Sequence, residues 1–251
     1  MTNEDILRAL SNVQEPDLGK DLVTLNMVKD IVIDGNKVSF TVVLTTPACP
    51  LKDMIMNACI NAVKLLVNKE AEVQVNFSSN TTTNRQDGQN LLKGVKNIIA
   101  VVSGKGGVGK STVAANLALA LTKGGAKVGL MDADIYGPSQ PQMLGICGHP
   151  ESLDGKTMEP MYAHGIQAMS IGLLIDVETP MVWRGPMVTQ ALQQLLNDTN
   201  WKDLDYLIVD LPPGTGDIQL TLAQKIPVTG AVIVTTPQDI ALLDARKGLK
   251  M

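Results

Sequence analysis

The chain has 251 residues, a formal net charge of −4 at pH 7 and a hydrophobic content of 45%. The acidic balance argues against a nucleic-acid-binding surface, and no apolar run approaches the roughly 18 residues of a membrane span. The amino terminus lacks a signal peptide's basic and apolar regions, and the three cysteines are widely spaced. We therefore expect a cytoplasmic protein without a disulfide framework, and with neither nucleic acid nor membrane as a partner.

Residues 1–77 predict a small α+β domain. Thr2 can cap a first helix, and strands over 28–33 and 37–45 flank an Asp-Gly-Asn hairpin signal. A second helix follows, and alternating apolar residues over 73–77 predict a last strand, giving the order α-β-β-α-β. The apolar stripe expected on the second helix comprises Leu51, Ile55, Cys59, Ala62 and Leu66.

The two cysteines of this domain have different expected roles. Cys59 lies on the apolar stripe and is most simply a small buried hydrophobic residue. Cys49 lies between a strand and a helix start, where backbone N–H groups lower a thiol pKa and favour the thiolate that binds soft metals. A loop cysteine without chemistry is an equally weighted alternative for Cys49.

A composition change separates this domain from the rest of the chain. Residues 78–90 are polar, with almost nothing to bury, which predicts a linker over 78–93. Residues 94–251 then form the larger unit.

The larger unit opens with a phosphate-binding loop. An apolar strand over 98–102 precedes the pattern G-x-x-x-x-G-K-S, and a helix over 112–123 follows it. The glycines let backbone N–H groups surround a polyphosphate, and the helix N-terminus adds positive charge. Lys110 would reach the β- and γ-phosphates, while the Ser111 hydroxyl would bind Mg²⁺. The expected nucleotide-binding residues are Gly104, Lys105, Gly106, Gly107, Val108, Gly109, Lys110, Ser111 and Thr112.

A second lysine, Lys105, stands near the start of this loop. An ordinary phosphate-binding loop has no need of it, so a solvated loop residue is one interpretation. The other is a cation delivered across a dimer interface to the partner's nucleotide, where it stabilises transition-state charge as an arginine finger does. The amino-acid sequence of the loop, residues 105–111, resembles the deviant Walker loop of the MinD, ParA, nitrogenase-iron-protein and Mrp group of dimeric ATPases. This resemblance implies the second role for Lys105.

Acidic residues end two further apolar strands, predicted over 126–131 and 206–209. Ligands of open α/β sheets bind outside the carboxyl ends of the strands. Asp132 and Asp134 suit Mg²⁺ hydration and alignment of an attacking water, and Asp210 fits the Walker B acid that holds a magnesium-bound water. For Asp132 and Asp134 the structural alternative is capping of the next turn. For Asp210 it is a proline-rich exit from the strand.

Another strand over 230–235 and a helix after it continue the strand–helix alternation. This order predicts an α/β fold with a mainly parallel, doubly wound sheet. Arg184 precedes an amphipathic helix and is a candidate contact for nucleotide or partner, with a surface salt bridge as the equal alternative.

In combination, these segments resemble the Mrp-type (ApbC-like) ATP-binding iron–sulfur cluster carriers over essentially the whole chain. The matching segments of the larger unit are 105–111, 132–139, 183–187, 210–217 and 235–239. In the first domain, residues 15–19, the Asp34-Gly35 hairpin and residues 46–50 resemble the small iron–sulfur assembly domain.

The resemblance implies a homodimeric P-loop ATPase that holds a [4Fe–4S] cluster and transfers it to apoproteins, with assembly factors as further partners. It implies that Lys105 acts in trans, that Lys110 and Ser111 bind phosphate and magnesium, and that Asp134 positions water. Asp210 is then the Walker B acid. The resemblance also makes Cys49 a candidate for transient iron–sulfur contact.

One feature of that family is missing. Its members carry a Cys-x-x-Cys pair beyond the last helix found here, and this sequence has no such pair. We expect either a fragment or a copy without the carrier site, and, because apolar sheet surface would then be exposed, marginal stability or aggregation. ATP binding is accordingly better supported than cluster binding.

Two other functions stay open from the sequence. A positioning ATPase of the MinD or ParA kind would need a membrane-targeting tail or a basic DNA surface. An assembly adaptor would bind nucleotide only as a conformational latch.

Overall fold

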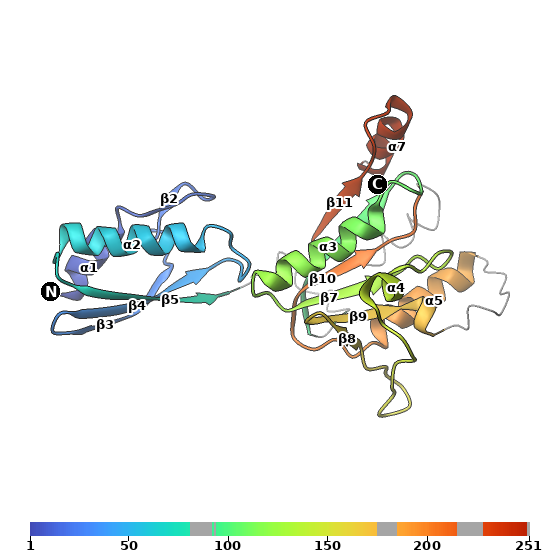
Figure 1. Cartoon of the computed structure of the whole chain (residues 1–251), viewed down its shortest axis with the longest axis horizontal. Helices are drawn as coiled ribbons and strands as arrows, with labels where there is room; N and C mark the ends of the chain where they lie inside the picture. Colours follow the sequence, from blue (N-terminus) through green and yellow to red (C-terminus); the bar gives the residue numbers. More distant parts are fainter. Residues whose placement is uncertain (81–91, 93, 175–184, 215–227, 250–251) are drawn as a thin grey trace. The chain divides into compact units, whose positions relative to one another are not determined.

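The computed structural model describes residues 1–80, 92, 94–174, 185–214 and 228–249. The chain forms two compact units, 1–82 and 83–251 (Figure 1). The proposed limits of the two domains and linker, 1–77, 78–93 and 94–251, stay predictions. Within the described ranges, no helix combines the length and the hydropathy that crossing a bilayer requires.

The first unit is a three-stranded sheet covered by helices. Its elements are α1 (Asn3–Leu10), β1 (Gln14–Glu15), β2 (Lys20–Asp21), β3 (Val28–Asp34), β4 (Lys37–Leu44), α2 (Lys52–Leu66) and β5 (Glu72–Ser79). The sheet order is β3-β4-β5, with β3 antiparallel and β5 parallel to β4. Thr2 caps α1 as predicted, in a capping box with Asp5. The core-facing residues of β4 are Val38, Phe40, Val42 and Leu44.

The predicted apolar stripe of α2 is wrong at its end. The buried residues of the helix are Ile55, Cys59 and Val63, whereas Leu66 is 60% exposed. Leu66 is the last helical residue, and the chain leaves the helix at the C-cap Val67. Side chains in a final turn have few neighbours, so the stripe ends one turn earlier than expected.

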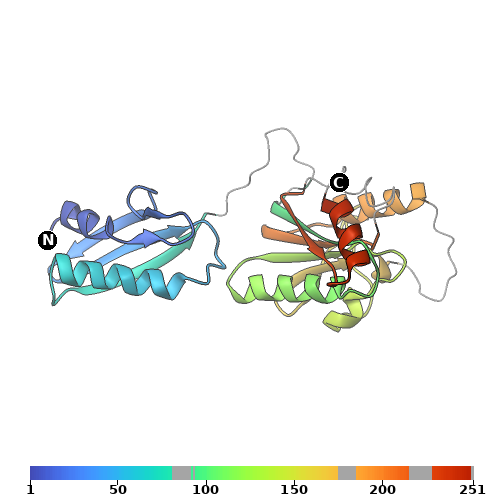
Figure 2. The ribbon, with the colours of Figure 1, turned by 90° about the horizontal axis from the view of Figure 1, so that it is seen from above.

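The second unit is a six-stranded, mainly parallel sheet between helices. Its elements are β6 (Val95–Ser103), α3 (Lys110–Lys123), β7 (Val128–Asp132), α4 (Gln140–Leu144), β8 (Met161–Ala163), β9 (Ile166–Ser170), η1 (Ile171–Leu173), α5 (Gly185–Asn197), β10 (Leu204–Asp210), β11 (Gly230–Val234) and α7 (Asp239–Leu249). The strand order is β11-β6-β10-β7-β9-β8, and among these described strands the β8–β9 pair is antiparallel and the other pairs are parallel. Figure 2 shows α3 and α5 on opposite faces. The fold class is therefore the predicted one, and the β8–β9 pair is an addition to it.

The strand order aligns the carboxyl ends of three central strands. Because β10 lies between β6 and β7, Asp210 is paired with Val101 on one side and with Asp132 on the other. Asp132 is in turn paired with Ser170 at the end of β9. The acidic residues predicted from separate strand ends thus stand in one row at the edge where the loop after β6 begins.

Apolar side chains are exposed on α7. Ile240, Leu243 and Leu249 are each more than half exposed. Exposed apolar surface is the reason for expecting marginal stability or aggregation, and that expectation stays a prediction.

A glycine ahead of β6 offers a test of the packing. Gly94 has φ +83°, and a Cβ there would lie 2.7 Å from the backbone oxygen of Trp201. We expect Gly94→Ala to destabilise the second unit by roughly 3 kcal/mol, because a left-handed conformation and a backbone collision add together. Gly155→Ala is the control, since Gly155 has φ +69° with open space around it and should cost about 1 kcal/mol.

The measurement is denaturant unfolding followed by tryptophan fluorescence. Both tryptophans, Trp183 and Trp201, belong to the second unit, so the signal reports that unit. Equal losses in the two variants would contradict the close approach at Gly94.

Candidate functional site

The loop between β6 and α3 turns through two left-handed glycines. Gly107 and Gly109 have φ +76° and +88°, conformations that other residues adopt only with strain. The helix starts at Lys110, two residues earlier than predicted, so Lys110 and Ser111 lie in its first turn. The Ser103 hydroxyl donates a 2.9 Å hydrogen bond to the backbone oxygen of Lys105 and so ties the loop to the strand before it.

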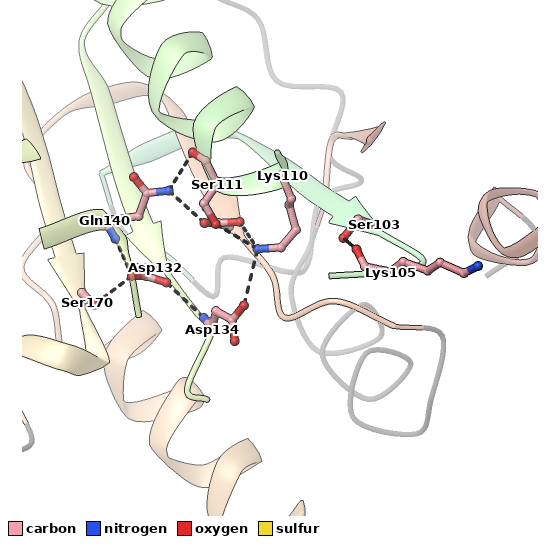
Figure 3. Close-up of polar contacts among 9 residues, drawn as sticks. Ser103, Lys105, Lys110, Ser111, Asp132, Asp134, Gln140 and Ser170 are labelled. Atoms are coloured by element: carbon pink, nitrogen blue, oxygen red, sulfur yellow. Dashed lines mark hydrogen bonds and ion pairs between the residues drawn. The ribbon is translucent and has the colours of Figure 1, made fainter. Parts of the chain in front are cut away.

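Lys110 lies at the centre of the site. Its side chain is 6% exposed, and its ammonium contacts Asp210 Oδ1 directly and Asp134 Oδ2 at 3.7 Å. It also lies 3.4 Å from the Ser111 hydroxyl oxygen. Figure 3 shows the Asp134 carboxylate directed at this ammonium. The structure thus brings Asp134 and Asp210, which lie far along the chain, to the adjacent residues Lys110 and Ser111.

Asp132 lies beside this group and is fully buried. Its Oδ2 accepts 3.1 Å hydrogen bonds from the Gln140 N–H and the Ser170 hydroxyl, and its Oδ1 accepts one of 3.2 Å from the Asp134 N–H. Burial raises the pKa of Asp132 to about 6; the bond from Gln140 opposes this rise and the charge of Asp210 adds to it. Asp132 therefore carries a charge at neutral pH, and within the described residues these three donors are its hydrogen-bond partners.

Asp134 has a raised pKa as well. Burial is the main cause, and the Lys110 ammonium opposes it. A carboxylate that is partly desolvated and held next to a cation is a suitable group for orienting a water molecule.

Lys105 points away from this cluster, towards α7 (Figure 3). Its ammonium lies 3.7 Å from Asp244 Oδ2 and its side chain is 42% exposed. Gly104 lets α7 come close, because a Cβ there would lie 2.6 Å from the Asp244 Cβ. The lysine is thus available at the surface, and its action on a partner's nucleotide stays a prediction.

The sequence analysis missed Gln140, Ser170 and Asp244. Each reaches the site from an element whose position only the tertiary structure gives: α4, the end of β9, and α7. No sequence signal singles them out. Arg184 and residues 215–217, the end of the matching segment 210–217, lie outside the described residues.

The donor set fits a magnesium–nucleotide complex. Mg²⁺ typically keeps several waters and takes one or two carboxylates together with substrate phosphates. Ser111 and Asp210 supply such hard oxygen atoms around Lys110. Consistently, in the part of the chain that the structure describes, no group of three or more His, Cys, Asp or Glu side chains forms an all-protein metal cage.

The cysteines do not form a site for an iron–sulfur cluster among the described residues. Cys59 is buried, and burial raises its thiol pKa to about 12, which makes it inert. Cys49 is half-buried and packs against the core of the first unit, and Cys147 is exposed in the second. Cys49 therefore stays a candidate only for transient contact.

A parallel sheet, a glycine loop leading into a helix, and a buried lysine set against strand-end carboxylates define a P-loop NTPase. Comparisons with known proteins specify it further. A family model described as NUBPL iron-transfer P-loop NTPase, of the ParA group, matches residues 94–251, and a model described as iron–sulfur cluster assembly protein matches residues 3–76. The chain belongs to the iron–sulfur cluster carrier family.

Individual relatives agree with this family assignment. The iron–sulfur cluster carrier protein of Synechocystis is 54% identical over 256 residues, covering 100% of this chain and 72% of that protein. Its counterpart in Haemophilus influenzae is 50% identical, with 98% and 67% covered. A solved nucleotide-binding protein of Archaeoglobus fulgidus, in complex with ADP, is 41% identical with a TM-score of 0.56, covering 64% of this chain and 63% of that one.

Asp132 gives this site a predictable pH response. Its pKa rises from 3.8 to about 6 on folding. Between these values the folded state holds a proton that the unfolded state releases, so stability falls as the pH rises from about 4 to 6. In Asp132→Asn this loss is absent, and we expect the stability of the variant relative to wild type to rise by up to about 3 kcal/mol between pH 4 and 7.

The measurement is denaturant unfolding across this pH range, without nucleotide or Mg²⁺. Using the difference between variant and wild type removes any constant offset from altered hydrogen bonds. Asp154→Asn is the control, because backbone hydrogen bonds from Thr157 and Lys156 lower the pKa of Asp154 below its ordinary value, so Asp154 is ionised in both states above pH 4 and its difference should stay nearly constant across this range. A pH-independent difference for Asp132→Asn would refute the expectation.

Proposed function

We propose that this chain binds and hydrolyses ATP as a cytoplasmic homodimer, and thereby carries iron–sulfur clusters to apoproteins together with assembly factors. The observation that carries the proposal is the meeting of Lys110, Ser111, Asp134 and Asp210 around one ammonium at the carboxyl edge of the sheet. The Archaeoglobus relative, a nucleotide-binding protein in complex with ADP, supports nucleotide binding by this chain.

In this proposal the loop holds the phosphates. The backbone N–H groups of 104–112 and the N-terminus of α3 face the polyphosphate, and Lys110 exchanges its carboxylate contacts for the β- and γ-phosphates. The Ser111 hydroxyl would hold Mg²⁺, and Asp132 and Asp210 would hold its water molecules. Bound Mg²⁺ neutralises charge on the phosphate oxygens.

Asp134 orients the water that attacks the γ-phosphorus. Its carboxylate lies 3.7 Å from the Lys110 ammonium, the group that would contact the terminal phosphate. The attacking oxygen forms a bond to phosphorus as the bond to the ADP oxygen breaks, and the released groups are ADP and phosphate. Lys105 of the second copy of this chain supplies a further positive charge to the transferred phosphoryl group.

Complementation between two inactive variants tests both roles and the dimer. Lys105→Gln removes the trans cation and Asp134→Asn removes the water-orienting carboxylate, so each variant alone should lose on the order of 10³-fold or more in ATP turnover. In a mixed dimer one site has its own Asp134 and receives Lys105 from the other copy. An equal mixture should therefore regain about a quarter of wild-type turnover, since half of the dimers have one of two sites intact.

No recovery in the mixture would contradict action in trans. Each variant should still bind the nucleotide, and calorimetry checks this. Lys110→Gln is the contrasting variant, because it removes the direct phosphate contact and should lose binding itself.

Cluster carriage is tested separately from ATP turnover. Anaerobic reconstitution with iron and sulfide, followed by mixing with an apo-ferredoxin, should give ATP-dependent appearance of the acceptor's cluster spectrum. The shared name of the relatives favours carriage over positioning. Transfer that survives loss of turnover in Lys105→Gln would favour a nucleotide-latched adaptor instead.

Transfer reduced in Cys49→Ser but not in Cys59→Ser would support the transient role of Cys49.

A further inference from the structure

Gln140, the first residue of α4, connects one helix and two strands of the site. Its side chain is 2% exposed. Its amide nitrogen donates hydrogen bonds of 3.0 Å to the backbone oxygen of Ser111 and 2.8 Å to Asp210 Oδ2. Its backbone N–H donates to Asp132 Oδ2 at 3.1 Å. One residue therefore joins the start of α3 to the ends of β10 and β7 (Figure 3).

The orientation of this amide is fixed by its partners. Both groups that the nitrogen faces are acceptors, a carbonyl and a carboxylate, so the flipped amide would set its oxygen against two other oxygens. In the orientation that satisfies them, Gln140 Oε1 is buried without a hydrogen-bond partner in the described structure. An unpaired buried carbonyl is costly, and a hydrocarbon side chain of equal length would avoid that cost. The value of glutamine here lies in its two donors.

These donors set the direction of Asp210. One carboxylate oxygen, Oδ2, is held by Gln140, while the other, Oδ1, contacts the Lys110 ammonium, which also lies 3.4 Å from the Ser111 hydroxyl oxygen. Asp210 has no exposed surface, so solvent cannot replace the amide. The carboxylate is consequently held with a single oxygen towards the phosphate end of the site.

We propose that Gln140 is a positioning residue for magnesium-dependent nucleotide binding: it orients Asp210 and fixes its distance from Ser111. The inference rests on the proposed function of the site. Groups that orient a metal-binding side chain typically contribute 10- to 100-fold to metal affinity.

The test compares binding of a non-hydrolysable ATP analogue with Mg²⁺ and with EDTA, by calorimetry on the 251-residue chain. Gln140→Met keeps the length of the side chain and the backbone N–H but removes both donors. We expect the Mg²⁺-dependent gain in affinity to fall about tenfold or more, while affinity in EDTA changes less than about twofold. Gln142→Met, an exposed position on the same helix, is the control and should keep the full gain.

A second variant guards against a folding defect. Gln140→Glu preserves shape and places an oxygen against the Ser111 carbonyl and Asp210 Oδ2, so its Mg²⁺-dependent gain should fall at least as far. Thermal unfolding without nucleotide checks that both variants fold. An unchanged gain in a folded variant, or equal losses with and without Mg²⁺, overturns the positioning role. Absence of any Mg²⁺-dependent binding in the wild type instead overturns the proposed function, and this inference with it.

Discussion

A buried ammonium with more carboxylates than it can neutralise dominates this molecule. Lys110 is almost fully enclosed, Asp134 and Asp210 contact it, and Asp132 lies beside these two carboxylates; all three acids have little or no exposed surface. Buried charges need partners, and one cation cannot compensate three anions. A bare polyphosphate would add further negative charge to the same space. The arrangement therefore favours a nucleotide that arrives together with a divalent cation over the nucleotide alone.

The sheet creates this arrangement through strand order. The chain goes from β6 through α3 to β7, skipping one position, and β10 later fills the gap between them. The filling strand brings Asp210 into register with Asp132 and next to the loop that presents Lys110. A change in β10 register by one residue would turn Asp210 to the other face of the sheet. The close packing of Gly129 against Leu204 and Leu207 opposes such a slip.

The sequence was sufficient for those parts of the site that local chemistry marks. The glycine loop, Lys110 and the acids at strand ends are recognisable because a short run of residues forms each feature. Gln140, Ser170 and Asp244 are different, since their roles depend on where α4, β9 and α7 come to lie. Leu66 shows the same limit in the first unit: its spacing is helical, but its burial depends on where the helix ends.

Two lysines of one loop are suited to opposite tasks by their burial. Lys110 is held in place, because moving it would leave Asp210 as an uncompensated buried charge. Only another bound positive charge could replace the ammonium beside Asp210. Lys105 is 42% exposed, and its pair with Asp244 at 3.7 Å is worth at most about 1 kcal/mol. Asp244 also lies 3.6 Å from Lys247, so it keeps a cation when Lys105 leaves. In the proposed dimer, the energetic cost of moving Lys105 to another copy of the chain would therefore be small, because this lysine is exposed and weakly held.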